Sequence, residues 1–224
     1  MKTPIKYNLS LLSKGFTLVE MAIVLIIIGL LVSTLLAPLS AQRDLKDYSQ
    51  VRTDLEQIQE ALYGYAVVNG SLPCPDTNGD GIADACGGLT NATSTGGNIP
   101  WVTLGVQISD PWGRPYQYRV NDSFGTIFSL STAGTGLGIL RVCTDSTCVA
   151  TVANNVPAVI YSSGKNGAVQ PPISADELEN RVTAGATFDR TFVSHNFSPT
   201  FDDVVVWLSP NILFNRMVTA GKLP

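Results

Sequence analysis

The N-terminal part of the chain contains a long apolar segment without a charge. No charged residue occurs between Met21 and Gln42. An α-helix over residues 16–38 would be about 35 Å long at about 1.5 Å per residue, slightly more than the roughly 30 Å hydrocarbon core of a bilayer. We therefore predict a membrane-spanning helix over residues 16–38.

The hydrophobic pattern becomes one-sided after Pro38. Apolar residues now recur at steps of three and four, with charged residues between them: Leu45, Tyr48, Val51, Leu55, Ile58, Leu62 and Tyr65. This spacing is typical of a helix with a single buried face. We predict that the helix continues over residues 39–68, that Asn69-Gly70 and Pro73 end it, and that its apolar face lies on a sheet.

Short apolar and β-branched runs separated by turn residues follow in the C-terminal half. The predicted strands are 116–120, 126–130, 139–143, 148–152, 158–161 and 204–208. Such a series predicts an antiparallel meander, and with the long helix an α+β fold.

Two further segments complete this prediction. Residues 69–115 are rich in Gly, Asn, Asp, Thr and Pro, which predicts a long loop region of the kind that is usually functional or cross-linked. The tail is expected to form a short helix with Ser209 as N-cap, Pro210 in the first turn and Gly221 at its end.

The distribution of charge predicts how the chain lies in a membrane. Lys2, Lys6 and Lys14 are the only charged residues among the first 15, so this end should stay cytoplasmic while the remainder faces outward. A secretory signal peptide is the alternative, but its apolar core is usually shorter and ends at a small-residue cleavage site. Loss of residues 1–15 would remove three of 14 basic and none of 18 acidic residues and change the net charge from −4 to −7. We therefore predict no binding to nucleic acid.

The four cysteines lie in the part of the chain that is expected to be exported. In an oxidising compartment an even number predicts disulfides, and four cysteines allow three pairings. Proximity favours Cys74–Cys86 and Cys143–Cys148, the second at a hairpin tip. A four-cysteine zinc site is the alternative, although the chain contains no C-x-x-C pair.

An acidic loop between the first two cysteines has the spacing of a calcium site. Its candidate oxygen ligands occur at alternate positions: Asp76, Asn78, Asp80, Ile82 through its carbonyl, and Asp84. Gly81 provides the sharp turn that such loops need. The twelfth position is Gly87, so the usual bidentate glutamate is missing and any site should be weak. The alternative is a solvated turn without a metal.

The junction Lys14-Gly15-Phe16-Thr17-Leu18-Val19-Glu20 resembles the processing site of type IV prepilins and type II secretion pseudopilins. This resemblance implies that prepilin peptidase cleaves between Gly15 and Phe16 and that the new N-terminus, Phe16, is methylated. It also implies a role for Glu20 in assembly. A carboxylate in a lipid-buried helix costs about 3 kcal/mol, and Glu20 lies on the same helix face as the new ammonium of Phe16.

A second segment, Asp110-Pro111-Trp112-Gly113-Arg114-Pro115-Tyr116, resembles the motif that opens the sheet of the major type II secretion pseudopilins. The two resemblances together imply a pilin-like fold, with the long helix packed on an antiparallel sheet. In that family a loop nearer the C-terminus holds calcium. The acidic loop 76–84 precedes the motif, so its calcium prediction depends on ligand spacing alone.

No catalytic constellation is apparent, and we expect neither enzymatic activity nor an organic cofactor. Ser163-Gly164-Lys165 lacks the remaining residues of a P-loop, and residues 134–138 lack the full dinucleotide-binding fingerprint. The single histidine, His195, has no nucleophile motif nearby. A membrane-anchored hydrolase is therefore disfavoured.

The predicted function is that of a structural filament subunit. We expect a single-pass inner-membrane precursor whose C-terminal domain lies in the periplasm. Its expected partners are other pilin or pseudopilin subunits, prepilin peptidase and the inner-membrane assembly machinery. The mature chain of about 209 residues is large for a major pseudopilin, which favours a minor pilin or minor pseudopilin. The alternative is a calcium-dependent adhesin displayed on a pilin stem.

Overall fold

The computed structural model of the chain describes residues 15–85, 96–130, 140–167, 174–181 and 191–223, except for the side chains of residues 34–41 and 122. The helices are α1 (Leu18–Asn69), α2 (Trp101–Leu104), α3 (Ala175–Asn180) and α4 (Pro210–Thr219), with a 3-10 turn at Asp122–Phe124. The strands are β1 (Gly97–Asn98), β2 (Gln117–Val120), β3 (Leu140–Cys143), β4 (Thr151–Val156), β5 (Ala158–Ser162), β6 (Thr191–Val193) and β7 (Val204–Trp207).

The predicted long N-terminal helix is confirmed as α1. The chain divides into two compact units within this helix. Residues up to Lys46 form the first unit and Asp47–Pro224 the second. In the first unit, apolar side chains such as Leu18 and Leu25 are 89% and 65% exposed. Among the described residues, no helix is long and apolar enough to cross a membrane. The helix ends where predicted, because Gly70 takes a left-handed conformation with φ of 77°.

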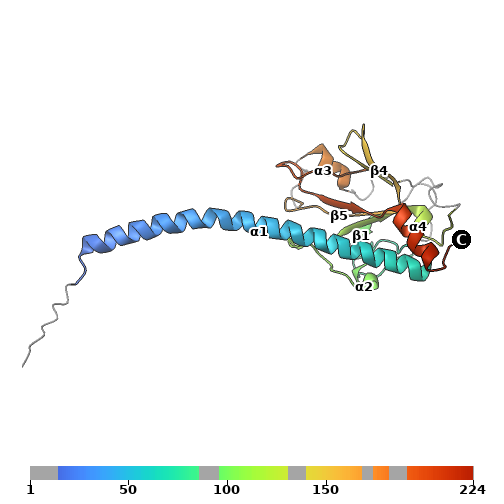
Figure 1. The fold of residues 1–224 in the computed structure, drawn as a ribbon, viewed down its shortest axis with the longest axis horizontal. Helices are drawn as coiled ribbons and strands as arrows, with labels where there is room; N and C mark the ends of the chain where they lie inside the picture. Colours follow the sequence, from blue (N-terminus) through green and yellow to red (C-terminus); the bar gives the residue numbers. More distant parts are fainter. Residues whose placement is uncertain (1–14, 86–95, 131–139, 168–173, 182–190, 224) are drawn as a thin grey trace, which may run out of the picture. The chain divides into compact units, whose positions relative to one another are not determined.

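The second unit is built around a four-stranded antiparallel sheet in the order β1-β2-β5-β7. Figure 1 shows the C-terminal part of α1 running along this sheet, with α4 beside the end of α1. One core lies between these elements and contains the predicted helix face, including Val51, Leu55, Ile58 and Leu62, all fully buried. The periodicity of α1 thus predicted these four buried residues correctly, whereas Leu45, assigned to the same face, is 72% exposed.

A smaller three-stranded sheet, in the order β4-β3-β6, covers the opposite face of the first sheet. Strand β5 alternates between the two cores: Ala158 and Ile160 pack toward α1, whereas Val159 and Tyr161 pack toward Val142 and the rest of the second sheet. Successive side chains of a strand point to opposite faces. The run of apolar and aromatic residues from Ala158 to Tyr161 agrees with burial of β5 on both faces.

The predicted meander is wrong in its topology. The strands form two sheets, and β3 pairs with β6 in parallel rather than antiparallel orientation. The predicted strand 126–130 is absent, because Phe128 packs edge-on against Phe124 and Phe214 while Ile127 is exposed. Strand β4 begins later than predicted, because Cys148 still belongs to the turn, with φ of 50°.

The predicted C-terminal helix is confirmed as α4, with Ser209 at the N-cap and Pro210 in its first turn. Arg216 donates two hydrogen bonds to the Glu60 carboxylate, at 2.7 and 2.9 Å, and lies over the Tyr63 ring at 4.6 Å from its centroid. Leu213 and Met217 are buried in the core against α1. The tail of the chain is therefore part of the helix–sheet core.

We expect Leu55→Ala to reduce the free energy of unfolding of the second unit by about 2–5 kcal/mol, since it leaves a cavity in the core. Leu45→Ala is the matched control, because Leu45 is 72% exposed on the same helix and should change stability by less than about 0.5 kcal/mol. Urea denaturation of the detergent-solubilised chain, followed by near-ultraviolet circular dichroism, measures both. Equal losses would contradict the assignment of the buried face.

Candidate functional site

Reciprocal hydrogen bonds between Thr17 and Glu20 stabilise the beginning of α1. The Thr17 hydroxyl accepts a bond from the Glu20 amide at 3.2 Å, and the Glu20 carboxylate accepts bonds from the Thr17 amide at 2.8 Å and hydroxyl at 2.9 Å. This arrangement is a capping box, and its T-x-x-E signature is visible in the sequence. Sequence reasoning assigned Glu20 only a role toward the Phe16 ammonium. The structure shows that Glu20 also caps the N-terminus of α1.

The acidic loop predicted to bind calcium is organised by Asp76. This buried carboxylate accepts bonds from the amides of Asn78 at 3.1 Å, Gly79 at 2.7 Å and Gly81 at 3.0 Å. Gly81 has φ of 78°, and a side chain there would meet the Trp101 ring. Both oxygens of Asp76 are therefore already satisfied by the backbone.

The other predicted ligands of the loop are also hydrogen-bonded within it. Asp84 accepts bonds from the amide and hydroxyl of Thr77, which lower the pKa of its carboxyl group. Asn78 accepts a bond from the Asp80 amide at 2.9 Å, and Asp80 accepts one from the Ile82 amide at 2.8 Å. The loop holds its shape through its own amides, and calcium binding there stays a prediction.

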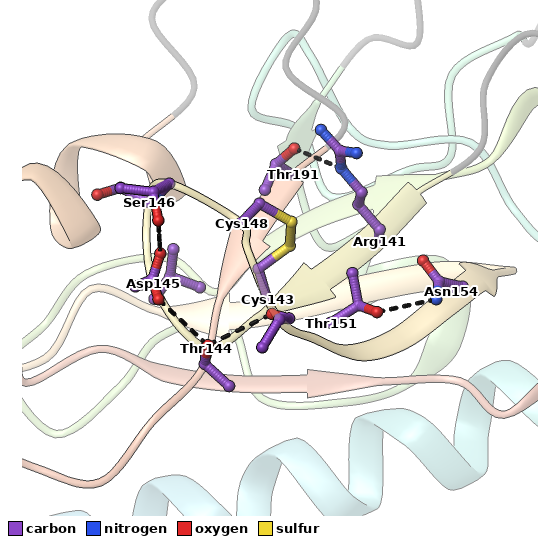
Figure 2. The surroundings of a disulfide bond; sticks show 12 residues. Arg141, Cys143, Thr144, Asp145, Ser146, Cys148, Thr151, Asn154 and Thr191 are labelled. Atoms are coloured by element: carbon purple, nitrogen blue, oxygen red, sulfur yellow. Dashed lines mark hydrogen bonds between the residues drawn. A yellow bond between two sulfur atoms is a disulfide. The ribbon is translucent and has the colours of Figure 1, made fainter.

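The predicted disulfide Cys143–Cys148 is present and closes the hairpin between β3 and β4, with Cα atoms 5.1 Å apart. Figure 2 shows this bond beside Arg141, which donates to Thr191 of the parallel strand β6 at 2.9 Å. Cys74 is also disulfide-bonded, and Cys86 lies outside the described residues. The Cys143–Cys148 bond rules out the two alternative pairings and leaves these thiols unable to act as zinc ligands.

A second group of carboxylates, which we call the acidic cluster, lies in the C-terminal half. It consists of Glu177 from α3 and of Asp202 and Asp203, which immediately precede β7. One oxygen from each lies within 4.8 Å of the others, and the residues are 0%, 6% and 7% exposed. In the part of the chain that the structure describes, this is the only group of acidic, His or Cys side chains close enough to share a metal ion.

Neighbouring donors satisfy some oxygens of the acidic cluster. Asn166 donates from its side chain to Glu177 at 2.8 Å and from its amide to Asp202 at 2.9 Å. The Tyr48 hydroxyl donates to Asp202 at 3.2 Å, and the Asn180 side chain donates to Asp203 at 2.9 Å. These contacts join α1, α3 and the segment after β5 at one point.

Other oxygens of this site have no donor. Oδ1 of Asp202, Oδ1 of Asp203 and Oδ1 of Asn166 are buried without a hydrogen-bond partner. A buried polar atom that lacks a partner costs about 1–3 kcal/mol, and more when the group is charged. Carboxylate and amide oxygens without donors are groups that a hard cation could satisfy.

The acidic cluster places three buried carboxylates together, and Arg181 lies 3.9 Å from Glu177. Burial raises the pKa of Asp203 to about 7, and burial also raises the pKa of Asp202. Carboxylate and amide oxygens are ligands that calcium accepts, so the residues present fit such an ion.

Sequence reasoning missed the acidic cluster, although some signals were present. Ser174 accepts a bond from the Glu177 amide and caps α3, so the S-x-x-E pattern of Ser174 and Glu177 could have predicted this helix. The doublet Asp202-Asp203 before a strand was a second signal. Nothing in the sequence indicated that residues 166, 177, 202 and 203 would meet.

Comparison with known proteins identifies two matching family models. Residues 12–36 match the prokaryotic N-terminal methylation motif, and residues 39–136 match type II secretion system protein G. No solved structure matches the chain significantly.

Curated relatives with significant similarity are type II secretion system core proteins G. The chain is 31% identical to the protein from Vibrio cholerae serotype O1 over 129 residues, which cover 54% of this chain and 81% of that protein. It is 29% identical to the protein from Aeromonas hydrophila over 124 residues (54% and 83%) and 30% identical to that from Klebsiella pneumoniae over 125 residues (54% and 86%). The chain therefore belongs to the type II secretion pseudopilin G family, whose members are structural and not enzymatic, and it carries the family's N-terminal methylation motif.

Proposed function

We propose that the chain is a filament subunit of a type II secretion pseudopilus, inserted in the inner membrane by the apolar half of α1 and then extracted into a periplasmic filament. The observation that carries this proposal is the methylation motif over residues 12–36, which includes the start of α1, where the described apolar side chains are exposed. Such a helix needs lipid or neighbouring helices to cover it. Its partners are then other pseudopilins, prepilin peptidase and the assembly machinery.

The names of the relatives favour a core subunit over the minor subunit expected from chain length. All four curated relatives with significant similarity are core proteins G. The family match ends at residue 136, before β3. We infer a core-type subunit with added C-terminal elements, the second sheet and α3, which account for its size.

The domain organisation that we propose follows the sequence prediction. Residues 1–15 are a cleaved leader, 16–38 insert in the membrane and polymerise, 39–68 continue the helix, 69–115 form the cross-linked loop region, and 116–224 form the sheets and the terminal helix. The contacts of the described residues give no specific support to the alternative, a calcium-dependent adhesin displayed on a pilin stem.

We expect the mature chain to begin at methylated Phe16, because the basic leader, the Gly15–Phe16 junction and the apolar helix together form the motif. Mass spectrometry of the protein purified from membranes measures this directly. Gly15→Leu should block cleavage and leave the full-length chain. A mature N-terminus at any other residue would exclude the proposed processing.

Glu20 offers a test that separates charge from capping. Glu20→Ala removes both, whereas Glu20→Gln preserves hydrogen bonds to Thr17 and removes the charge. If the carboxylate neutralises the Phe16 ammonium in the filament, both variants should insert in the membrane yet lose filament incorporation. Quantitative immunoblotting of filaments isolated from the periplasmic fraction measures incorporation. Normal incorporation of Glu20→Gln would show that only the cap matters.

We also propose that the acidic cluster holds a calcium ion. The support is geometric: three buried carboxylates lie together, and Oδ1 of Asp202, of Asp203 and of Asn166 is buried without a hydrogen-bond partner. The cluster lies nearer the C-terminus than the Asp110–Tyr116 motif, as the family resemblance implied for calcium. In the acidic loop, by contrast, Asp76 already accepts three backbone bonds.

Calcium should raise the melting temperature of the full chain, with a stabilisation of about 2.7 kcal/mol at 100 times the dissociation constant. Asp203→Asn should abolish most of this shift, because it removes a charged ligand. Asp80→Asn should leave it unchanged if the ion binds at the cluster, and should abolish it if the ion binds at the loop. Thermal denaturation with calcium and with chelator distinguishes the two sites. No shift in the wild type would exclude both.

A further inference from the structure

We propose that Asp176 is a positioning residue for the acidic cluster, and that it fixes α3 by joining the Cys143–Cys148 hairpin to His195. This inference rests on the cation site proposed above and adds the elements that hold it in shape. Asp176 would not contact the ion, since it lies outside the cluster.

Helix α3 supplies two of the groups that shape the cluster. Glu177 is one of the three carboxylates, and the fully buried Asn180 donates to Asp203 at 2.9 Å and to the Val193 carbonyl at 3.0 Å. The helix has only six residues, and isolated helices shorter than about 12 residues are marginal in water. Its position must therefore come from contacts with other elements.

Asp176, next to Glu177 in the first turn, makes two such contacts with different parts of the fold. Its Oδ1 accepts a bond from the Ser146 amide at 2.8 Å, and its Oδ2 lies 3.1 Å from Nε2 of His195. The two oxygens thus link α3 to the tip of the β3–β4 hairpin and to the segment after β6.

Both partners of Asp176 are themselves held in place. The hairpin tip is closed by the disulfide and by bonds to Asp145 from the amides of Thr147 and Cys148. The His195 ring stacks on Phe201, with centroids 3.9 Å apart, and Phe201 is buried directly before Asp202. The contacts of Asp176 therefore connect one ligand segment, Glu177, with the other, Asp202-Asp203.

This connection predicts an effect on affinity. Groups that orient metal ligands from outside typically change metal affinity by about 10–100-fold when they are removed. We expect the loss of Asp176 to release the first turn of α3, so that Glu177 no longer converges with Asp202. Calcium affinity should then fall although every ligand is retained.

The experiment is isothermal titration of calcium into the detergent-solubilised full chain, well below its melting temperature. Asp176→Ala should raise the dissociation constant for calcium about 10-fold or more. Asp176→Asn keeps an acceptor for the Ser146 amide, so its affinity should lie closer to that of the wild type than that of Asp176→Ala does. Glu56→Ala is the matched control, because it removes an exposed carboxylate from α1 and none of the contacts described above for α3 and the hairpin. It should bind within about twofold of the wild type.

The outcomes separate the two proposals. Absence of calcium binding by the wild type overturns both the cation site and the positioning role. Binding by the wild type with equal affinity in Asp176→Ala overturns the positioning role alone, as does an equal loss in Glu56→Ala. If Asp176→Ala fails to fold, the variant Cys143→Ser/Cys148→Ser tests the same connection: an unchanged affinity overturns the role of the hairpin, and a weakened one supports it.

Discussion

The central sheet of the second unit is buried on both faces, and most of the structure depends on this constraint. On one face α1 and α4 cover Ile160 and its neighbours, and on the other β3, β4 and β6 cover Val159 and Tyr161. A strand in this position can have apolar residues at every position. The second sheet also places the hairpin and α3 near the segment that leads into β7.

The two acidic groups of the chain differ in a way that follows from this packing. In the loop 76–84, carboxylates accept bonds from amides a few residues away, as is usual for Asp and Asn in tight turns. In the acidic cluster the carboxylates come from separate elements, and packing leaves Oδ1 of Asp202 and of Asp203 without donors. Only the second group has buried oxygens that a cation would satisfy.

The two halves of helix α1 differ in the exposure of their apolar side chains. The apolar side chains described over residues 16–33 are exposed, whereas beyond Asp47 one face is buried against the sheet. The capping box of Thr17 and Glu20 begins this helix inside the segment that matches the methylation motif.

The sequence by itself determined the helix, most of its buried face, its end at Asn69-Gly70, the C-terminal helix and the family, and it favoured the Cys143–Cys148 pairing that the structure contains. These features depend on periodicity, turn residues and motifs, which are local. Only the tertiary structure decided the division into two sheets, the parallel pairing of β3 with β6 and the meeting of Glu177 with Asp202 and Asp203. Strand pairing and side-chain convergence join residues far apart in the chain, and an alternating pattern specifies which face is buried without specifying the partner.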